Sequence, residues 1–273
     1  MTPTVPDHDP LPGSPDDGHR FGASDAHDSA GHPWSGRVFQ PNPHAADDGR
    51  PDPALAAALT AFGAGSGTAT AVVDAIRTAR LLAPLVAEAG TIVRTASGRL
   101  VDKSQELSLV TVAGPDGRPV LPAFTDVEAM RAWDPAARPV PVEGQRLALA
   151  AASEGSPVVL NAGGTDEFVL RPTALVAVAT ERAWRPPHED PAVQQAFAAS
   201  FAAEDAVRAI ELRPGDPEAR LAGPELVVVL SLVEGLDRAA LDAVIGRLST
   251  AWAASPAIAD GVDSLTIRLV SAA

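Results

Sequence analysis

The chain has 273 residues, a formal net charge of −14 and no cysteine. The lack of cysteine excludes disulfides, thiol catalysis, iron–sulfur clusters and cysteine zinc sites. Phosphate contacts need clustered Lys and Arg, yet Lys103 is the only lysine and the arginines are scattered. We therefore expect no nucleic acid and no anionic membrane surface as a partner.

The composition also suggests a cellular setting. The first residues lack the basic start and apolar run of a signal peptide, and no apolar stretch reaches the roughly 20 residues that span a bilayer. Arginine outnumbers lysine 20 to 1, which is typical of proteins from GC-rich bacteria. We expect a cytoplasmic bacterial protein with no membrane association.

Residues 1–50 differ from the rest of the chain. They contain eight Asp, eight Pro and five of the six His, with few apolar side chains. Such a composition cannot offset the entropy of ordering the chain, so we expect a disordered acidic tail. The five histidines are spaced irregularly and match no compact ligand pattern, so we expect no metal site.

The first helix is expected to begin at Asp52-Pro53, because Asp caps helices and Pro suits their first position. A second helix is expected over Ala69–Ala79, where apolar residues recur at helical spacing. The apolar segment Leu81–Ala87 is expected to form a strand, and Pro84 within it favours an edge or bulge position.

A hairpin is expected where Leu107–Val112 and Pro119–Pro122 flank Gly114–Arg118, since Pro and Gly supply turn dihedrals. Thr125 and Glu128 have the spacing of a capping box, which predicts a helix that runs to about Trp133. Further elements are expected as a strand at Arg138–Val142, a helix at Gln145–Ser153, a strand pair at Pro157–Asn161 and Glu167–Leu170, and a helix at Thr173–Thr180.

The segment Trp184–Pro191 is the clearest linker in the chain. Beyond it we expect a helix at 191–199, a strand at 204–212, a polar turn around 214–217, a strand at 225–233 buried on both faces, a helix capped by Asp237, and a strand at 262–270. The predicted fold class is α+β. A mixed sheet with flanking helices over residues 51–185 is followed by a smaller ββαβ-like unit over 191–273.

Motifs for common chemistries are missing. The lone lysine stands in no phosphate loop, no Gly-x-Gly-x-x-Gly follows a strand, and Ser66 lacks the glycines of a nucleophile elbow. His188, the only histidine beyond residue 50, lies in the linker, which argues against a Ser-His-Asp triad. We therefore assign no catalytic residue, no cofactor and no metal ligand.

Several segments resemble a known family. These are Trp34–Arg37 with Pro41–Pro43 and Asp47–Gly49, the segment Ala79–Val86, and above all Leu107–Ala137. They are similar to bacterial SseB-family proteins over roughly residues 35–185, and more loosely over Val227–Val270. The family is named for enhanced serine sensitivity, a phenotype. The resemblance implies an α+β domain without assigned catalytic residues, and the family's recurring Lys-Ser before the central strand stands here as Lys103-Ser104.

Three functions are compatible with these observations. The first is a non-enzymatic binding or scaffold protein whose candidate surface comprises Lys103, Ser104, Arg118, Phe124, Trp133 and Arg138. Its partner is an unknown protein or a second copy, paired through the edge strand Leu81–Ala87 or Leu265–Val270. Phe124 and Trp133 could instead be core residues. The second is a sensor for an amino-acid metabolite, with Lys103 and Arg118 holding a carboxylate. The third is a hydrolase with an unrecognised carboxylate site.

Overall fold

A computed structural model describes residues 47–86, 93–94, 100–101, 111–115 and 117–271. Asp47–Ala273 form one compact unit. Most of the expected acidic tail lies outside the described residues, and so do Lys103, Ser104 and the beginning of the predicted strand Leu107–Val112.

The first two helices follow the predicted signals. Helix α1 is Pro53–Gly63, and the Asp52 carboxylate accepts hydrogen bonds from the amides of Ala54 and Leu55. Helix α2 is Ala69–Ile76, three residues shorter than predicted. It ends early because the chain turns at the Ala79 amide, which donates to the Ile76 carbonyl, and then enters a strand at once.

That strand, β1 at Arg80–Leu85, pairs antiparallel with β6 at Arg138–Glu143. On its other side, the backbone of Leu82 exchanges two hydrogen bonds with Phe124, of 2.8 and 2.9 Å. Strand β1 is therefore hydrogen-bonded on both sides near its middle and does not offer the open edge that Pro84 suggested. Two short strands, β2 at Val93–Arg94 and β3 at Leu100–Val101, pair with each other.

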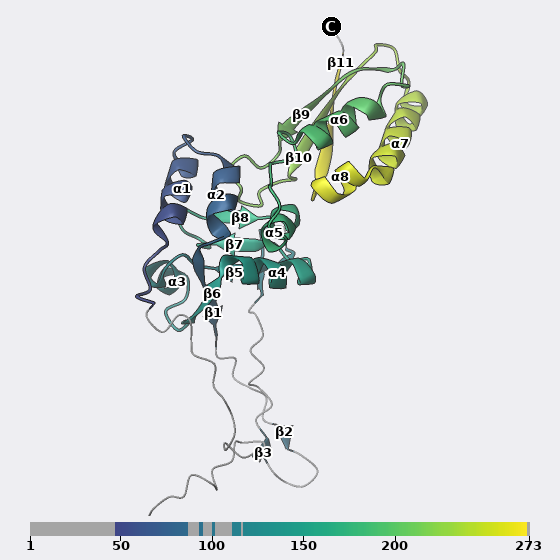
Figure 1. Ribbon diagram of the computed structural model, residues 1–273. Helices are drawn as coiled ribbons and strands as arrows, with labels where there is room; N and C mark the ends of the chain where they lie inside the picture. The colour runs from purple at the N-terminus through teal and green to yellow at the C-terminus, as the bar shows by residue number, and fades with distance from the viewer. Residues whose placement is uncertain (1–46, 87–92, 95–99, 102–110, 116, 272–273) are drawn as a thin grey trace, which may run out of the picture. The chain divides into compact units, whose positions relative to one another are not determined.

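A four-stranded mixed sheet is the centre of the first half (Figure 1). Its order is β4-β5-β7-β8, and only β5 and β7 run parallel. The bounds are β4 Val112–Ala113, β5 Pro119–Ala123, β7 Val158–Leu160 and β8 Phe168–Leu170. The predicted hairpin between β4 and β5 is confirmed, and Gly117 supplies its positive φ of 78°.

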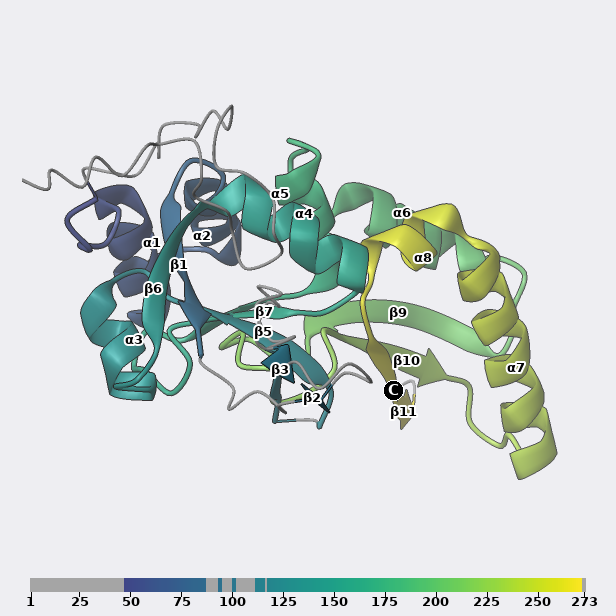
Figure 2. The same cartoon turned by 90° about the horizontal axis from the view of Figure 1, so that it is seen from below.

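Helices cover one face of this sheet. The helices of this region are α3 Val127–Trp133, α4 Gly144–Glu154 and α5 Pro172–Ala179. Figure 2 shows α4 and α5 lying over β5 and β7. Since side chains alternate along a strand, Leu121, Leu160 and Leu170 all point to this face, where they share a core with α1, α2, α4 and α5.

A segment from the second half of the chain covers part of the opposite face. Val120, Val159 and Val169 point there and form a small cluster with Leu221, which is 3% exposed. Leu221 belongs to the connection of residues 215–225, which we call the docking loop. The sequence analysis expected only a polar turn near this position. Its first residues are polar, but Leu221 further along is buried on the sheet.

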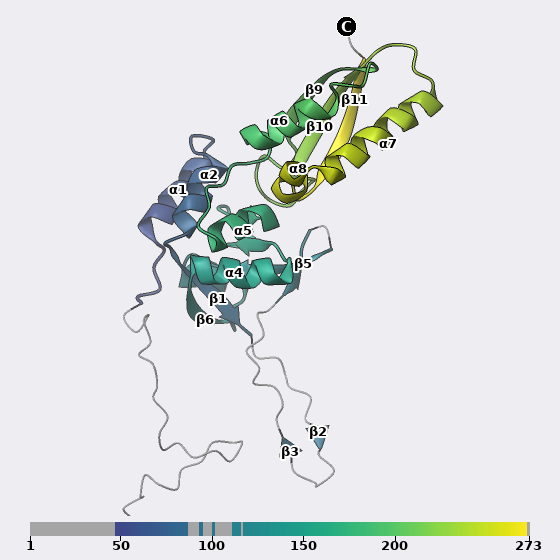
Figure 3. The ribbon, with the colours of Figure 1, turned by 45° about the vertical axis from the view of Figure 1, so that its right-hand side comes forward.

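The second half has the predicted ββαβ order, with one extra helix. Its elements are α6 Pro191–Ser200, β9 Val207–Pro214, β10 Leu226–Leu232, α7 Arg238–Ala254, α8 Pro256–Gly261 and β11 Leu265–Ser271. Strand β10 is central, antiparallel to β9 and parallel to β11. Figure 3 shows α6, α7 and α8 on one face of this sheet, where Phe197 packs on Trp252. Within the described part, no helix is long and apolar enough to cross a membrane.

The predicted capping box at Thr125 is wrong. The N-cap of α3 is Asp126, whose Oδ1 accepts a 2.8 Å hydrogen bond from the Ala129 amide. Thr125 is 2% exposed, and its amide and hydroxyl are both bonded to the buried Asn161. A Thr side chain held in this way cannot reach the helix amides, so the helix begins one residue later.

The cap assignment predicts that Asp126→Ala lowers the free energy of unfolding by about 1 kcal/mol, because an α3 amide loses its partner. Glu128→Ala, the other half of the expected capping box, should change it by less than about 0.5 kcal/mol. Urea unfolding of the two variants measures both values. Equal losses would contradict the assignment of Asp126 as the cap.

Candidate functional site

The two halves of the chain meet at the guanidinium of Arg171, which directly follows β8 and precedes α5. Its Nη2 donates to Asp216 Oδ2 at 2.8 Å and to the Gly223 carbonyl at 2.7 Å. Its Nη1 donates to Asp263 Oδ2 at 3.0 Å. The three charged side chains are 7%, 3% and 9% exposed, so this is a buried network of one cation and two carboxylates.

Asp216 also organises the docking loop. Its carboxylate accepts hydrogen bonds from the amides of Arg220 and Leu221, at 3.2 and 2.8 Å. Ala219 and Leu221 have positive φ values of 50° and 57°, which non-glycine residues adopt only when their surroundings hold them. Because the Val169 amide donates to the Ala219 carbonyl at 2.7 Å, the loop is bound to the edge of β8.

Glu225 ends the docking loop directly before β10 and is 9% exposed. Its Oε2 accepts a 2.7 Å hydrogen bond from the Asp263 amide, and its Oε1 is 3.4 Å from the Thr173 hydroxyl. Burial raises the pKa of Glu225 to about 7, although the Asp263 amide and the Arg171 charge oppose this shift. A carboxyl group that titrates near neutral pH is common at functional sites.

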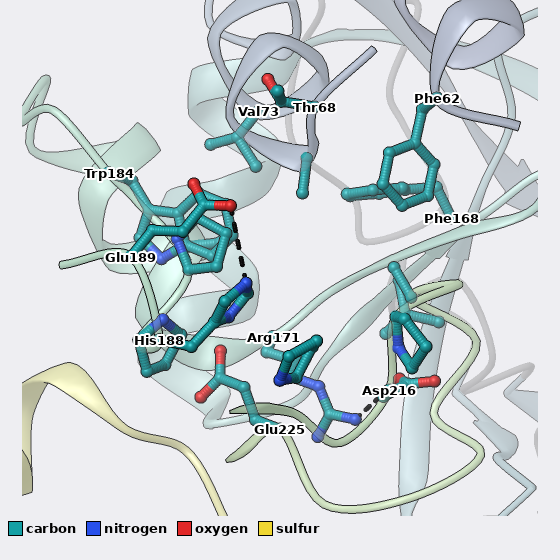
Figure 4. A pocket seen from close by; sticks show the side chains of 18 of the residues that line it. Phe62, Thr68, Val73, Phe168, Arg171, Trp184, His188, Glu189, Asp216 and Glu225 are labelled. Atoms are coloured by element: carbon teal, nitrogen blue, oxygen red, sulfur yellow. Dashed lines mark hydrogen bonds and ion pairs between the residues drawn. The ribbon is translucent and has the colours of Figure 1, made fainter. Parts of the chain in front are cut away.

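A cavity of about 280 Å³ opens beside these groups (Figure 4). Phe62, Phe168 and Trp184 form aromatic walls, and Phe62 meets Phe168 edge to face with ring centroids 5.1 Å apart. The linker supplies the rim, where His188 Nε2 lies 3.5 Å from Glu189 Oε1. Apolar walls with a few convergent polar groups are the usual composition of a small-ligand site.

Comparison with protein families matches residues 55–177 to the SseB protein N-terminal domain. The chain therefore contains an SseB N-terminal domain. No curated protein and no solved structure matched the chain. The matched SseB domain runs from α1 into α5 and contains Arg171, whereas Asp216, Glu225 and Asp263 lie beyond it. The cavity is thus built jointly by the SseB domain and the C-terminal segment.

The described residues of the predicted binding surface do not lie together in the structure. Phe124 is fully buried and packs on the half-buried Trp133, with ring centroids 5.3 Å apart, so both belong to the core of the SseB domain. Arg118 is exposed at the hairpin and lines a second cavity of about 350 Å³, beside Leu221 and Ser264. Arg138 is exposed on β6 and lines neither cavity.

The sequence analysis missed the residues that the fold brings together. The sequence offers only a weak sign that Arg171 is functional, because a charged residue directly after an apolar strand is also typical of an ordinary surface turn. The sign for Glu225 is equally weak, since it is a carboxylate between Pro224 and the apolar run of β10. Among the residues described, no group of three or more His, Asp or Glu side chains could hold a metal ion.

The Arg171 network predicts a large loss of stability for Arg171→Met. This change leaves the carboxylates of Asp216 and Asp263 buried without their cation, which should cost about 3–5 kcal/mol. Arg213→Met is the control, because the Arg213 guanidinium also donates two hydrogen bonds to carboxylate oxygens, both of Glu211, but does so on the surface. Urea unfolding should show a much smaller change for the control, and similar changes would contradict the role of Arg171.

The raised pKa of Glu225 predicts a distinctive pH dependence. The folded state binds this proton more tightly than the unfolded chain, whose Glu has a pKa near 4.5, so the contribution of Glu225 is most favourable at low pH and is lost as pH rises through about 7. Glu225→Gln has no carboxyl group at this position and so does not lose stability in this way. The free energy of unfolding of Glu225→Gln minus that of the parent protein should therefore rise by roughly 2 kcal/mol between pH 5 and pH 8.

The charged and polar groups near Glu225, namely Arg171, Asp216, Asp263 and His188, are present in both proteins, so what they add to the pH dependence largely cancels in the difference. Glu211→Gln, on the exposed face of β9, should give a flat difference over the same range. Urea unfolding at several pH values measures both. A flat difference for Glu225→Gln would contradict the pKa.

Proposed function

We propose that this SseB-family protein is a non-enzymatic cytoplasmic binding protein, and that the cavity beside Arg171 and Glu225 takes a small ligand. The observation that carries the proposal is the cavity itself, where aromatic walls converge with a buried acid whose pKa lies near neutrality. Of the three functions that the sequence left open, the cavity supports the small-ligand sensor. We propose that the ligand binds at the junction of the SseB domain with the C-terminal segment, and not at Lys103 and Arg118 as the sequence suggested.

The position of the cavity suits a sensor. Its walls come from α1, α2 and β8 of the SseB domain, from the linker, and from the docking loop. A ligand that contacts all of these segments favours the arrangement in which they are together. Binding would therefore stabilise the docked state and could report ligand concentration to a partner through population shift.

The hydrolase alternative has weaker support. Acid–base hydrolysis by paired carboxylates needs one that can act as a base or nucleophile beside the acid. Glu225 has the raised pKa of an acid, but Asp216 and Asp263 are both committed to Arg171 at 2.8 and 3.0 Å. The arrangement thus favours binding without a chemical step.

Self-association is a second candidate, and strand β11 favours it. Among the described strands, β11 is hydrogen-bonded only to β10, and Leu269 and Val270 on it are 41% and 37% exposed. An edge strand with exposed apolar side chains can pair with a second copy of the same chain. Of the two edge strands that the sequence suggested for homodimerisation, β11 remains a candidate. Strand β1 does not, since it is hydrogen-bonded on both sides near its middle.

A thermal-shift screen of the full chain against a panel of amino acids and their metabolites tests the ligand proposal. A ligand that binds the native state raises the melting temperature, and the rise grows with the ratio of its free concentration to its dissociation constant. Ala69→Phe should strongly reduce the shift, because Ala69 lines the cavity and a phenyl ring there would occupy part of it.

Ala71→Phe is the matched control, since Ala71 is exposed on the same helix and does not line the cavity. It should keep the shift of the parent protein. A panel without any shift would contradict the ligand proposal. So would a shift that Ala69→Phe leaves unchanged.

A further inference from the structure

The charges around the cavity indicate which ligand it takes. Among the described residues that line it, Arg171 is the only arginine or lysine, but its guanidinium is already matched by two buried carboxylates, Asp216 and Asp263. An anionic ligand would have to compete with both for the same donors. Arg171 is therefore a poor anchor for a carboxylate or phosphate group.

Glu225 is the group with unused bonding capacity. Its Oε2 has a short partner in the Asp263 amide, but Oε1 has only the Thr173 hydroxyl at 3.4 Å. Figure 4 shows the carboxyl group pointing into the cavity. A buried carboxylate with one weakly bonded oxygen gains most from a positively charged hydrogen-bond donor, which replaces the water that burial removed.

The remaining polar groups at the rim also favour a positively charged ligand. Glu189 adds a second carboxylate, and His188 is its neighbour at 3.5 Å. The faces of Phe62, Phe168 and Trp184 are electron-rich, and aromatic rings attract cations as well as apolar groups. Since Arg171 is neutralised, the net charge that a ligand meets in the cavity is negative.

We propose that the ligand is a small organic cation, a protonated amine with an apolar group. Its ammonium would donate to Glu225 Oε1, and its apolar part would lie against Phe62, Phe168 and Trp184. This inference rests on the proposed function, because it names the ligand class of the same cavity. It replaces the carboxylate ligand that the sequence suggested, since the cation of this site is already paired.

Three probes of the same shape test the charge of the ligand. Phenethylamine, phenethyl alcohol and 3-phenylpropionate share a phenyl ring and a short chain, and they end in a cation, a neutral hydroxyl and an anion. We expect isothermal titration of the full chain at pH 8 to give binding of phenethylamine at least about tenfold tighter than of the other two, because only the amine brings a positive charge to the Glu225 carboxylate.

Variants show whether Glu225 is the anchor. Glu225→Gln should reduce the affinity for phenethylamine to that for phenethyl alcohol, whereas Glu211→Gln, outside the cavity, should leave it unchanged. The unfolding curve of Glu225→Gln establishes independently that this variant folds. The parent protein should also bind phenethylamine more weakly at pH 6 than at pH 8, because a protonated Glu225 lacks the charge that attracts the amine.

The outcomes distinguish this inference from the proposed function. Tighter binding of 3-phenylpropionate or phenethyl alcohol would overturn the cationic ligand and still leave a cavity that takes small molecules. Undiminished binding of phenethylamine to Glu225→Gln would overturn the anchor. If none of the three probes binds, the inference is wrong, and the metabolite panel then decides the proposed function by itself.

Discussion

The guanidinium of Arg171 holds together parts of the chain that are far apart in sequence. It belongs to the SseB domain, yet its partners are Asp216 and Gly223 of the docking loop and Asp263 just before β11. Burying two carboxylates is costly unless a cation lies between them, and burying the cation requires the carboxylates. The three groups therefore stabilise one another only when both halves of the chain are in place.

The cavity follows from this constraint. With the docking loop bound to Arg171, Leu221 covers part of the sheet face opposite the helices, and Glu225 lies at the start of β10. Glu225 is then buried, and burial raises its pKa to about 7 although the Asp263 amide and the Arg171 charge oppose the rise. The properties that suggest a ligand site thus arise from the way the two halves are joined, and neither half has them alone.

Much of the local structure could be predicted from the sequence. Asp52 and Asp237 cap helices as expected, because capping depends on a side chain and amides a few residues away. The hairpin at Gly117 and the ββαβ order of the second half follow from turn residues and apolar runs that act over similarly short distances. Thr125 shows where this reasoning fails, since its buried contact with Asn161 lies 36 residues away and takes precedence over the local capping pattern.

The candidate site shows the same contrast between features that depend on nearby residues and features that depend on distant ones. Composition and motifs by themselves determined the α+β class, the SseB resemblance and the lack of thiol, phosphate-loop and dinucleotide chemistry, because these depend on which residues are present and on their spacing. Only the tertiary structure decided that Phe124 is a core residue and that Arg171, Asp216, Glu225 and Asp263 meet at one point. The physical reason is that a charged residue beside an apolar strand looks the same in sequence whether it faces solvent or a buried partner, and the partners of Arg171 lie 45 and 92 residues further along the chain.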